Sequence, residues 1–276
     1  MTTPPPADVD AFRAFEHAGW QDTTPQYHHA LGALTTQAIG PLLDAVRVGK
    51  GMYLLDVATG PGYAAAAAAH RGSDAIGTDF SAAMVAQARQ LHPTVEFREG
   101  DAEALPFPEE SFDAVVMNFG LLHFPQPERA LGEAHRVLRH GGRVGFTVWT
   151  KPEEAVGFHI VLRAIETHGN MNVPLPPGPP FFRFSDPDEC HRVLLEAGFV
   201  TPHIDQVAQV WRLDSPDALY QAILNGTVRT GALLRAQSSE ALTAIRTAMR
   251  DAARAYEPEG IIALPMPAVL ASAVKP

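Results

Sequence analysis

The sequence is poor in cysteine and in positive charge. Its 276 residues include one cysteine, and 31 acidic residues outnumber 21 basic ones, which gives a formal net charge of −10. A single cysteine excludes an internal disulfide and any zinc cluster built from cysteines. Because nucleic-acid binding requires a basic face, the acidic balance argues against a nucleic-acid partner. Cys190 lies in the helix-like DPDECHRVLLEAGF and is predicted to be a small buried core residue.

Long hydrophobic runs and metal-ligand spacings are also missing. No apolar stretch approaches the roughly 20 residues that span a bilayer, so we expect no membrane span. The first residues, MTTPPPADVD, have acids and prolines where a signal peptide has basic residues and an apolar core, which favours a cytoplasmic protein. The 12 histidines show neither HxxxH nor HExxH spacing, so no metal site is expected.

Short apolar segments alternate with helix-like segments in the first half of the chain. MYLLDV, DAIGTDFS, TVEFREGDA, FDAVVMNF and RVGFTVW predict five strands. The alanine run after Gly62 predicts a helix, and so does AAMVAQARQLH, with Ser81 as its N-cap. A third helix is predicted from Gln126 to Leu138, and we expect the glycines of His-Gly-Gly (140–142) to end it. With two later strands, this alternation predicts an α/β fold with a three-layer, doubly wound, mostly parallel seven-stranded Rossmann-like sheet.

The remaining segments predict one domain, residues 11–276, behind a disordered tail at 1–10. An N-terminal helical segment is expected over 12–48. The sheet core is expected at about 50–150, 186–213 and 266–275, where 199–213 would be one strand. Two insertions, 151–185 and 214–258, would form a helical cap over the substrate, with helices near 153–168, 215–234 and 238–256. The insertion at 151–185 also contains the proline-rich loop NVPLPPGPPFFRF.

The stretch LLDVATGPGYAAAAAAH places a tight turn between the first predicted strand and a helix. Gly60 permits a sharp turn and Gly62 removes a side chain where a ligand could contact the backbone. Asp79 follows Gly60 by 79 − 60 = 19 residues and ends the second strand, where a carboxylate can bind both ribose hydroxyls. These residues fit a nicotinamide dinucleotide or an adenosyl ligand, and a turn without a ligand is the third interpretation.

Five segments in a familiar order resemble the class I S-adenosylmethionine-dependent methyltransferases, particularly the small-molecule group that includes the ubiquinone and menaquinone biosynthesis enzymes. LLDVATGPG resembles the first motif, TDFS the second acidic motif, and GDAEALPFPEESFDAVVMNFGLLHF the third and fourth. RVLRHGGRVGFTVW resembles the motif of the fifth strand. The resemblance runs from about Trp20 to Phe199. In one departure Ala58 replaces the first glycine of D-x-G-x-G-x-G, and in another His140 replaces the proline of L-x-P-G-G.

The resemblance implies S-adenosyl-L-methionine as cofactor, S-adenosyl-L-homocysteine as product and a small-molecule substrate as partner. A homodimer is compatible with the sequence. The cofactor-binding residues so implied are Asp56, Ala58, Thr59, Gly60 and Gly62 at the methionine end, Asp79 at the ribose, Phe80 and Met84 at the adenine, Asp101 and Ala102 at its amine, Asn118 near the sulfonium, and Tyr27 or His28 as a cover.

Methyl transfer from a sulfonium needs little beyond an aligned acceptor and exclusion of water. A general base is needed only if the acceptor loses a proton, and His123 in FGLLHF is the candidate, with a purely structural role as the alternative. An apolar or aromatic acceptor is indicated by six residues: Trp149, Phe158, Phe181, Phe182, Phe184 and Trp211. Two other functions remain open: an NAD(P)-dependent Rossmann oxidoreductase, and a non-catalytic or repurposed adenosyl-binding protein.

Overall fold

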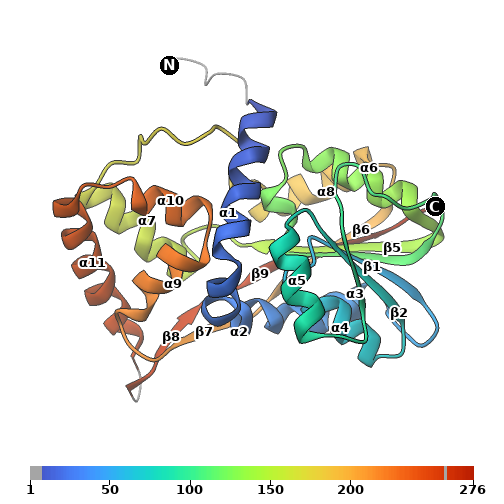
Figure 1. Cartoon of the computed structure of the whole chain (residues 1–276), viewed down its shortest axis with the longest axis horizontal. Coiled ribbons are helices and arrows are strands. Elements are labelled where there is room, and N and C mark those ends of the chain that lie inside the picture. The colour runs from blue at the N-terminus through green and yellow to red at the C-terminus, as the bar shows by residue number, and fades with distance from the viewer. Residues whose placement is uncertain (1–7, 258–259) are drawn as a thin grey trace.

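A central sheet of seven strands organises the molecule. The computed structural model describes residues 8–257 and 260–276 (Figure 1). The strand order is β3 (Glu96–Glu99), β2 (Asp74–Asp79), β1 (Tyr53–Val57), β4 (Phe112–Asn118), β5 (Leu138–Trp149), β9 (Ala268–Val274) and β6 (Val200–Val207). The strands from β3 to β5 pair in parallel, whereas β9 runs antiparallel between β5 and β6. The predicted Rossmann-like, mostly parallel sheet is therefore confirmed.

Helices cover both faces of this sheet. On one face lie α3 (Ile39–Ala45), α4 (Tyr63–His70) and α5 (Ala82–Leu91), and on the other α6 (Pro127–Val137) and α8 (Pro187–Glu196) (Figure 1). Leu54 of β1 packs in the core of α3 and α4, and its neighbour Leu55 packs in the core of α6. Successive strand residues point to opposite faces, so a strand covered on both sides is apolar throughout. The continuous apolar runs of the sequence have this cause.

The end of α6 differs from the expected glycine cap. The helix stops at Val137, and Leu138 already has extended backbone angles and begins β5. His140, Gly141 and Gly142 therefore lie inside the strand. Gly141 has a φ of +77°, and the pairing of β4 with β5 shifts register in this region. The glycines accommodate an irregularity of the strand.

Four helices form a cap at one end of the molecule: α7 (Val156–His168), α9 (Ala218–Gly226), α10 (Arg229–Arg235) and α11 (Ser239–Ala253) (Figure 1, left). The predicted strand 199–213 is wrong as a single element. Its second half, β7 (Val210–Leu213), leaves the main sheet and pairs with β8 (Ile262–Pro265). Gln209 lies at the break and donates its side-chain amide to the carbonyl of Leu34. The predicted helix 215–234 is likewise divided at Thr227, whose hydroxyl accepts the N–H of Gly231.

A long N-terminal helix, α1 (Val9–Ala30), lies between the cap and the sheet (Figure 1). It is followed by the short α2 (Gly32–Thr35) and packs against α9 and α5. Asp8 caps α1 by accepting the N–H of Ala11, so the helix begins inside the segment expected to be a tail. Residues 1–7 of that expected tail lie outside the described residues. Within the described ranges, no helix combines the length and apolarity needed to cross a membrane.

Candidate active site

The turn after β1 is held by the buried carboxylate of Asp56. One oxygen, Oδ2, accepts hydrogen bonds from Thr59 Oγ1 at 2.6 Å and from the N–H of Ala65 at 2.9 Å. Burial raises the pKa of Asp56 to about 7, although these two hydrogen bonds favour the ionised form and lower it. The carboxylate thus ties the turn to the first residues of α4.

The two glycines of the turn have different surroundings. Gly60 has a φ of +52°, and a Cβ placed there would meet no atom within 4 Å, because the position opens onto a cavity. Gly62 has a φ of +85°, but a Cβ there would lie 2.6 Å from the ring of Phe97 and 3.1 Å from Ala88. Gly60 therefore leaves space for a ligand, whereas Gly62 leaves space for β3 and α5.

Ala58 occupies a conformation that usually requires glycine. Its φ is +54°, in the left-handed region, which disfavours side chains with a Cβ. Room for its methyl group comes from Gly120, where a Cβ would lie 2.7 Å from that of Ala58. The departure from the glycine pattern is thus matched by a second glycine on the neighbouring loop after β4.

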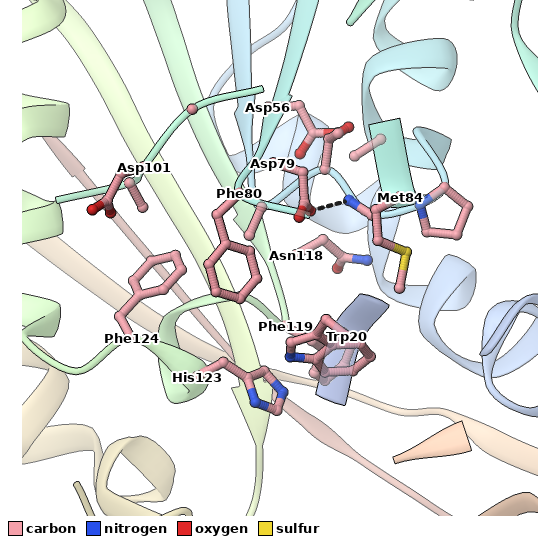
Figure 2. A pocket seen from close by; sticks show the side chains of 18 of the residues that line it. Trp20, Asp56, Asp79, Phe80, Met84, Asp101, Asn118, Phe119, His123 and Phe124 are labelled. Carbon is pink, nitrogen blue, oxygen red and sulfur yellow. Dashed lines mark hydrogen bonds between the residues drawn. The ribbon is translucent and has the colours of Figure 1, made fainter. Parts of the chain in front are cut away.

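Asp79 ends β2 and faces the same cavity (Figure 2). Its two oxygens accept the N–H groups of Gly60 and Ser81, each at 2.9 Å. Burial raises the pKa of Asp79 to about 6, partly offset by these bonds. Ser81 is the N-cap of α5, as predicted, and its hydroxyl donates to Gln21 of α1. The helix α1 is thereby fixed to the rim of the site.

Arg13 of α1 binds the acidic residues that follow β3. Its guanidinium contacts Asp101 at 2.6 Å and Glu103 at 2.5 Å. Asp101 also accepts the N–H of Glu103 through its other oxygen. This pair of contacts, which the sequence reasoning missed, joins α1 to the segment after β3.

These elements enclose a first cavity of about 90 Å³ at the carboxyl ends of β1, β2 and β4 (Figure 2). It is the place where open parallel sheets bind ligands. Of the predicted site residues, Gly62 and the alternative cover His28 are absent from its lining; Nδ1 of His28 instead contacts the hydroxyl of Tyr63. The predicted residues around it are Tyr27, Asp56, Ala58, Thr59, Gly60, Asp79, Phe80, Met84, Asp101, Ala102, Asn118 and His123.

A second cavity of about 40 Å³ adjoins the first on the side of the cap. Both cavities are lined by Trp20, Tyr27, Thr35, Phe119 and His123, so these residues form the boundary between them. Of the aromatic residues predicted to surround an acceptor, Trp149, Phe158 and Phe181 line the second cavity. Phe182, Phe184 and Trp211 do not line it.

One polar group of the second cavity is His123, which lies on the short helix η2 (Leu121–His123) after β4. Its Nδ1 is 3.1 Å from Oε2 of Glu16, a fully buried carboxylate of α1. The indole N–H of Trp20 donates to the same oxygen at 3.1 Å. With Nδ1–H donated to Glu16, the free lone pair of the imidazole is on Nε2. Glu16 and Trp20 lie on α1, from which the sequence indicated only Tyr27 or His28, because a single glutamate on a helix usually faces solvent.

Among the described residues no group of three or more histidine, cysteine, aspartate and glutamate side chains is placed to hold a metal ion. Cys190 is buried, donates its thiol to the carbonyl of Phe184 and has a pKa raised to about 12 by burial. It lies in the core, as predicted, and lines neither cavity.

The sheet is Rossmann-like, with acidic residues near the ends of β1 and β2 and a cavity that residues of α1 help to line. Residues 55–146 match the family model described as a methyltransferase domain. The chain thus carries a methyltransferase domain, and its resemblance to the class I S-adenosylmethionine-dependent methyltransferases is confirmed.

Curated relatives match less than half of the chain. The demethylmenaquinone methyltransferase of Renibacterium salmoninarum is 39% identical over 111 residues, which are 40% of this chain and 47% of the relative. That of Thermus thermophilus is 41% identical over 116 residues, 40% of this chain and 52% of the relative. An uncharacterised protein of Mycobacterium tuberculosis is 36% identical over 137 residues, 45% and 50% of the two chains. The chain therefore spans about half the length of the curated relatives it matches.

Solved structures show the same fold over most of the chain. A putative methyltransferase from Bacillus halodurans has a TM-score of 0.55 and 22% identity, covering 86% of this chain and 98% of its own. A phosphoethanolamine N-methyltransferase of Haemonchus contortus, solved with S-adenosylhomocysteine, has a TM-score of 0.58 and 18% identity. The match covers 96% of this chain and 60% of that protein. The cyclase SpnF has a TM-score of 0.58 and 18% identity, and the match covers 98% of this chain and 97% of SpnF. At these identities the likeness concerns the fold.

Proposed function

We propose that this chain transfers the methyl group of S-adenosyl-L-methionine to a small aromatic or apolar acceptor. The observation that carries the proposal is the pair of adjoining cavities. One is built from the turn, Gly60 and Asp79, and the other is lined by Trp149, Phe158 and Phe181. The residues present fit the cofactor, because Gly60 leaves open space and the buried carboxylate of Asp79 lies next to it.

In this proposal the first cavity holds the cofactor as follows. Asp79 accepts the two ribose hydroxyls, and Phe80 and Met84 contact the adenine. Asp101 and Ala102 face its exocyclic amine, and Asp101 is kept in place by Arg13. The residues left for the methionine end and sulfonium are Asp56, Ala58, Thr59, Gly60, Asn118 and Tyr27, while Gly62 acts indirectly through packing.

The cofactor supplies an activated methyl group, and the chain aligns the acceptor and excludes water. The second cavity holds the acceptor ring, and His123 removes its proton where one must be lost, with Glu16 orienting the imidazole. The proton passes to Nε2 of His123, the methyl group to the acceptor, and S-adenosyl-L-homocysteine remains. The names of the demethylmenaquinone methyltransferases support a quinone-like ring as acceptor.

The fold also accommodates chemistry other than methyl transfer, since the cyclase SpnF shares it. Adenosyl binding without methyl transfer is therefore the second candidate. The NAD(P)-dependent alternative loses support, because residues 55–146 match a methyltransferase domain.

Thermal unfolding with S-adenosyl-L-homocysteine beside NADH tests the proposal. At about 100 times its Kd the product should stabilise the protein by roughly 2.7 kcal/mol. We expect Asp79→Asn to lose this stabilisation and the control Asp74→Asn, at the exposed start of the same strand, to keep it. Stabilisation by NADH and none by S-adenosyl-L-homocysteine would refute the proposal. Binding without turnover of any quinol or phenol would favour the second candidate.

A further inference from the structure

Arg229 reaches the second cavity from the first residue of α10, on the side opposite the sheet. Its side chain is 21% exposed, yet its buried Nη1 finds no hydrogen-bond partner among the described residues. The nearest carboxylate oxygen, Oε1 of Glu16, lies 4.0 Å from Nε, beyond hydrogen-bond distance. That oxygen also has no hydrogen bond within the described part of the chain. The site thus contains a cation whose hydrogen-bonding capacity is unused.

Two aromatic rings hold the guanidinium in place. Its central carbon lies 5.2 Å from the ring centre of Phe12 and 5.4 Å from that of Phe181. Phe181 in turn packs edge-on against His123, with ring centres 5.9 Å apart. Cation–π contacts orient the guanidinium plane but give its N–H groups no acceptor. Leaving a buried charged donor unsatisfied is costly, and burial lowers the pKa of Arg229. An oxygen of a ligand in the second cavity would supply the acceptor that Arg229 lacks.

We propose that Arg229 binds the carboxylate of the acceptor, which is then an aromatic acid carrying a ring hydroxyl. This inference rests on the proposed function and narrows its substrate class. A guanidinium fork matches a carboxylate with two parallel hydrogen bonds. The ring would lie among Phe119, Trp149 and Phe158, with its hydroxyl toward His123.

The charges of the site agree with an anionic acceptor. Glu16 carries one negative charge and faces two groups, His123 at 3.1 Å and Arg229 at 4.0 Å. After methyl transfer the acceptor oxygen is neutral and the hydroxyl proton remains on His123, so the imidazolium and the guanidinium together carry one positive charge more than Glu16 balances. A carboxylate on the acceptor supplies the second negative charge at Arg229.

The test uses the full chain saturated with S-adenosyl-L-homocysteine and two probes, 3-hydroxy-2-naphthoate and its methyl ester. The two differ in charge and little in shape. Binding is measured by calorimetry and by quenching of tryptophan fluorescence, since Trp20 and Trp149 line the cavity. We expect the carboxylate to bind at least tenfold more tightly than the ester.

Arg229→Gln should remove this preference and leave affinity for S-adenosyl-L-homocysteine unchanged. Arg229→Lys keeps the charge but lacks the two parallel donors, so it should retain part of the preference for the carboxylate. It is the variant to measure if Arg229→Gln fails to fold. The control is Arg212→Gln, an exposed arginine of β7 outside both cavities. Equal affinity of the wild type for the two probes, no binding of the carboxylate, or an unchanged preference in both Arg229 variants would overturn the inference. Failure of the wild type to bind S-adenosyl-L-homocysteine would instead count against the proposed function.

Discussion

At the scale of single residues, the site depends on a few side chains whose neighbours are remote in sequence. Asp56, Gly60 and Asp79 could be selected from sequence because a strand end, a turn and a fixed spacing mark them. Glu16 could not, because its partner His123 is 107 residues away and only the folded chain brings them together. The packing constraint at Gly62 was hidden for a similar reason, since Phe97 of another strand fills the space beside it, and its role at the cofactor stays a prediction.

The first prediction concerns His123 as a base. With an acceptor that must lose a proton, His123→Gln should lower kcat by about 10²–10⁴, because general-base catalysis contributes in that range. Affinity for S-adenosyl-L-homocysteine should stay the same by calorimetry. The control is His29→Gln, on the exposed side of α1. An unchanged kcat in the His123 variant would leave that residue with a structural role only.

At the scale of elements, α1 is the part that joins the two halves of the site. Arg13 and Gln21 bind residues on the sheet side. Trp20 lines the second cavity, and Glu16 bonds His123 behind its wall. Its approach to the cap is close at Gly19, where a Cβ would lie 2.3 Å from a methyl group of Val228. Small residues let two helices pack at such short range.

The second prediction follows from that contact. Gly19→Ala should destabilise the protein by about 1–2 kcal/mol, because overpacking against the buried Val228 outweighs the better helix propensity of alanine. Gly40→Ala in α3 is the matched control: a Cβ there meets nothing within 4 Å, so it should be neutral or slightly stabilising. Urea unfolding measures both. Equal effects of the two substitutions would contradict the close packing of α1 on the cap.

Elements could be predicted where one local signal dominated. The strands β1 and β4 agree with their apolar runs because they are buried on both faces, and Ser81 caps α5 by accepting the N–H of Met84. Prediction from the sequence failed where tertiary contacts determine where an element begins or ends. The glycines after Leu138 suggested a helix end but accommodate an irregularity of β5. Gln209 divides the predicted strand 199–213 into β6 and β7 by binding the backbone of α2.

At the scale of the whole molecule, two buried carboxylates make stability depend on pH. Burial raises the pKa of Asp56 to about 7 and that of Asp79 to about 6. The folded state therefore holds these protons more tightly than the unfolded chain, whose aspartates titrate near 3.9. The protonated forms of Asp56 and Asp79 stabilise the folded state fully below about pH 3.9. This stabilisation is lost as the pH rises through 6 and 7. As the pH rises, the buried carboxylates at the site ionise and lower the free energy of unfolding.

The third prediction is that Asp56→Asn relieves part of this loss. The amide oxygen can still accept from Thr59 and Ala65, because both bond one oxygen of the aspartate. The gain in unfolding free energy over the wild type should be about 2–3 kcal/mol larger at pH 8 than at pH 5. Urea unfolding at the two pH values measures it, with the exposed Asp214→Asn as control. A difference that does not change with pH would show that Asp56 titrates alike in the folded and unfolded chains.

The place of β9 has a consequence for synthesis in the cell. Of the seven sheet strands it is the last along the chain, yet it lies between β5 and β6 and pairs with both. While the polypeptide leaves the ribosome, β6 has no sheet neighbour, and β5 keeps an open edge. The exposed edge can pair with other chains until β9 is translated and fills the gap. Slow translation of the last segment, or loss of β9, should therefore direct nascent chains toward chaperones and aggregation instead of folded protein.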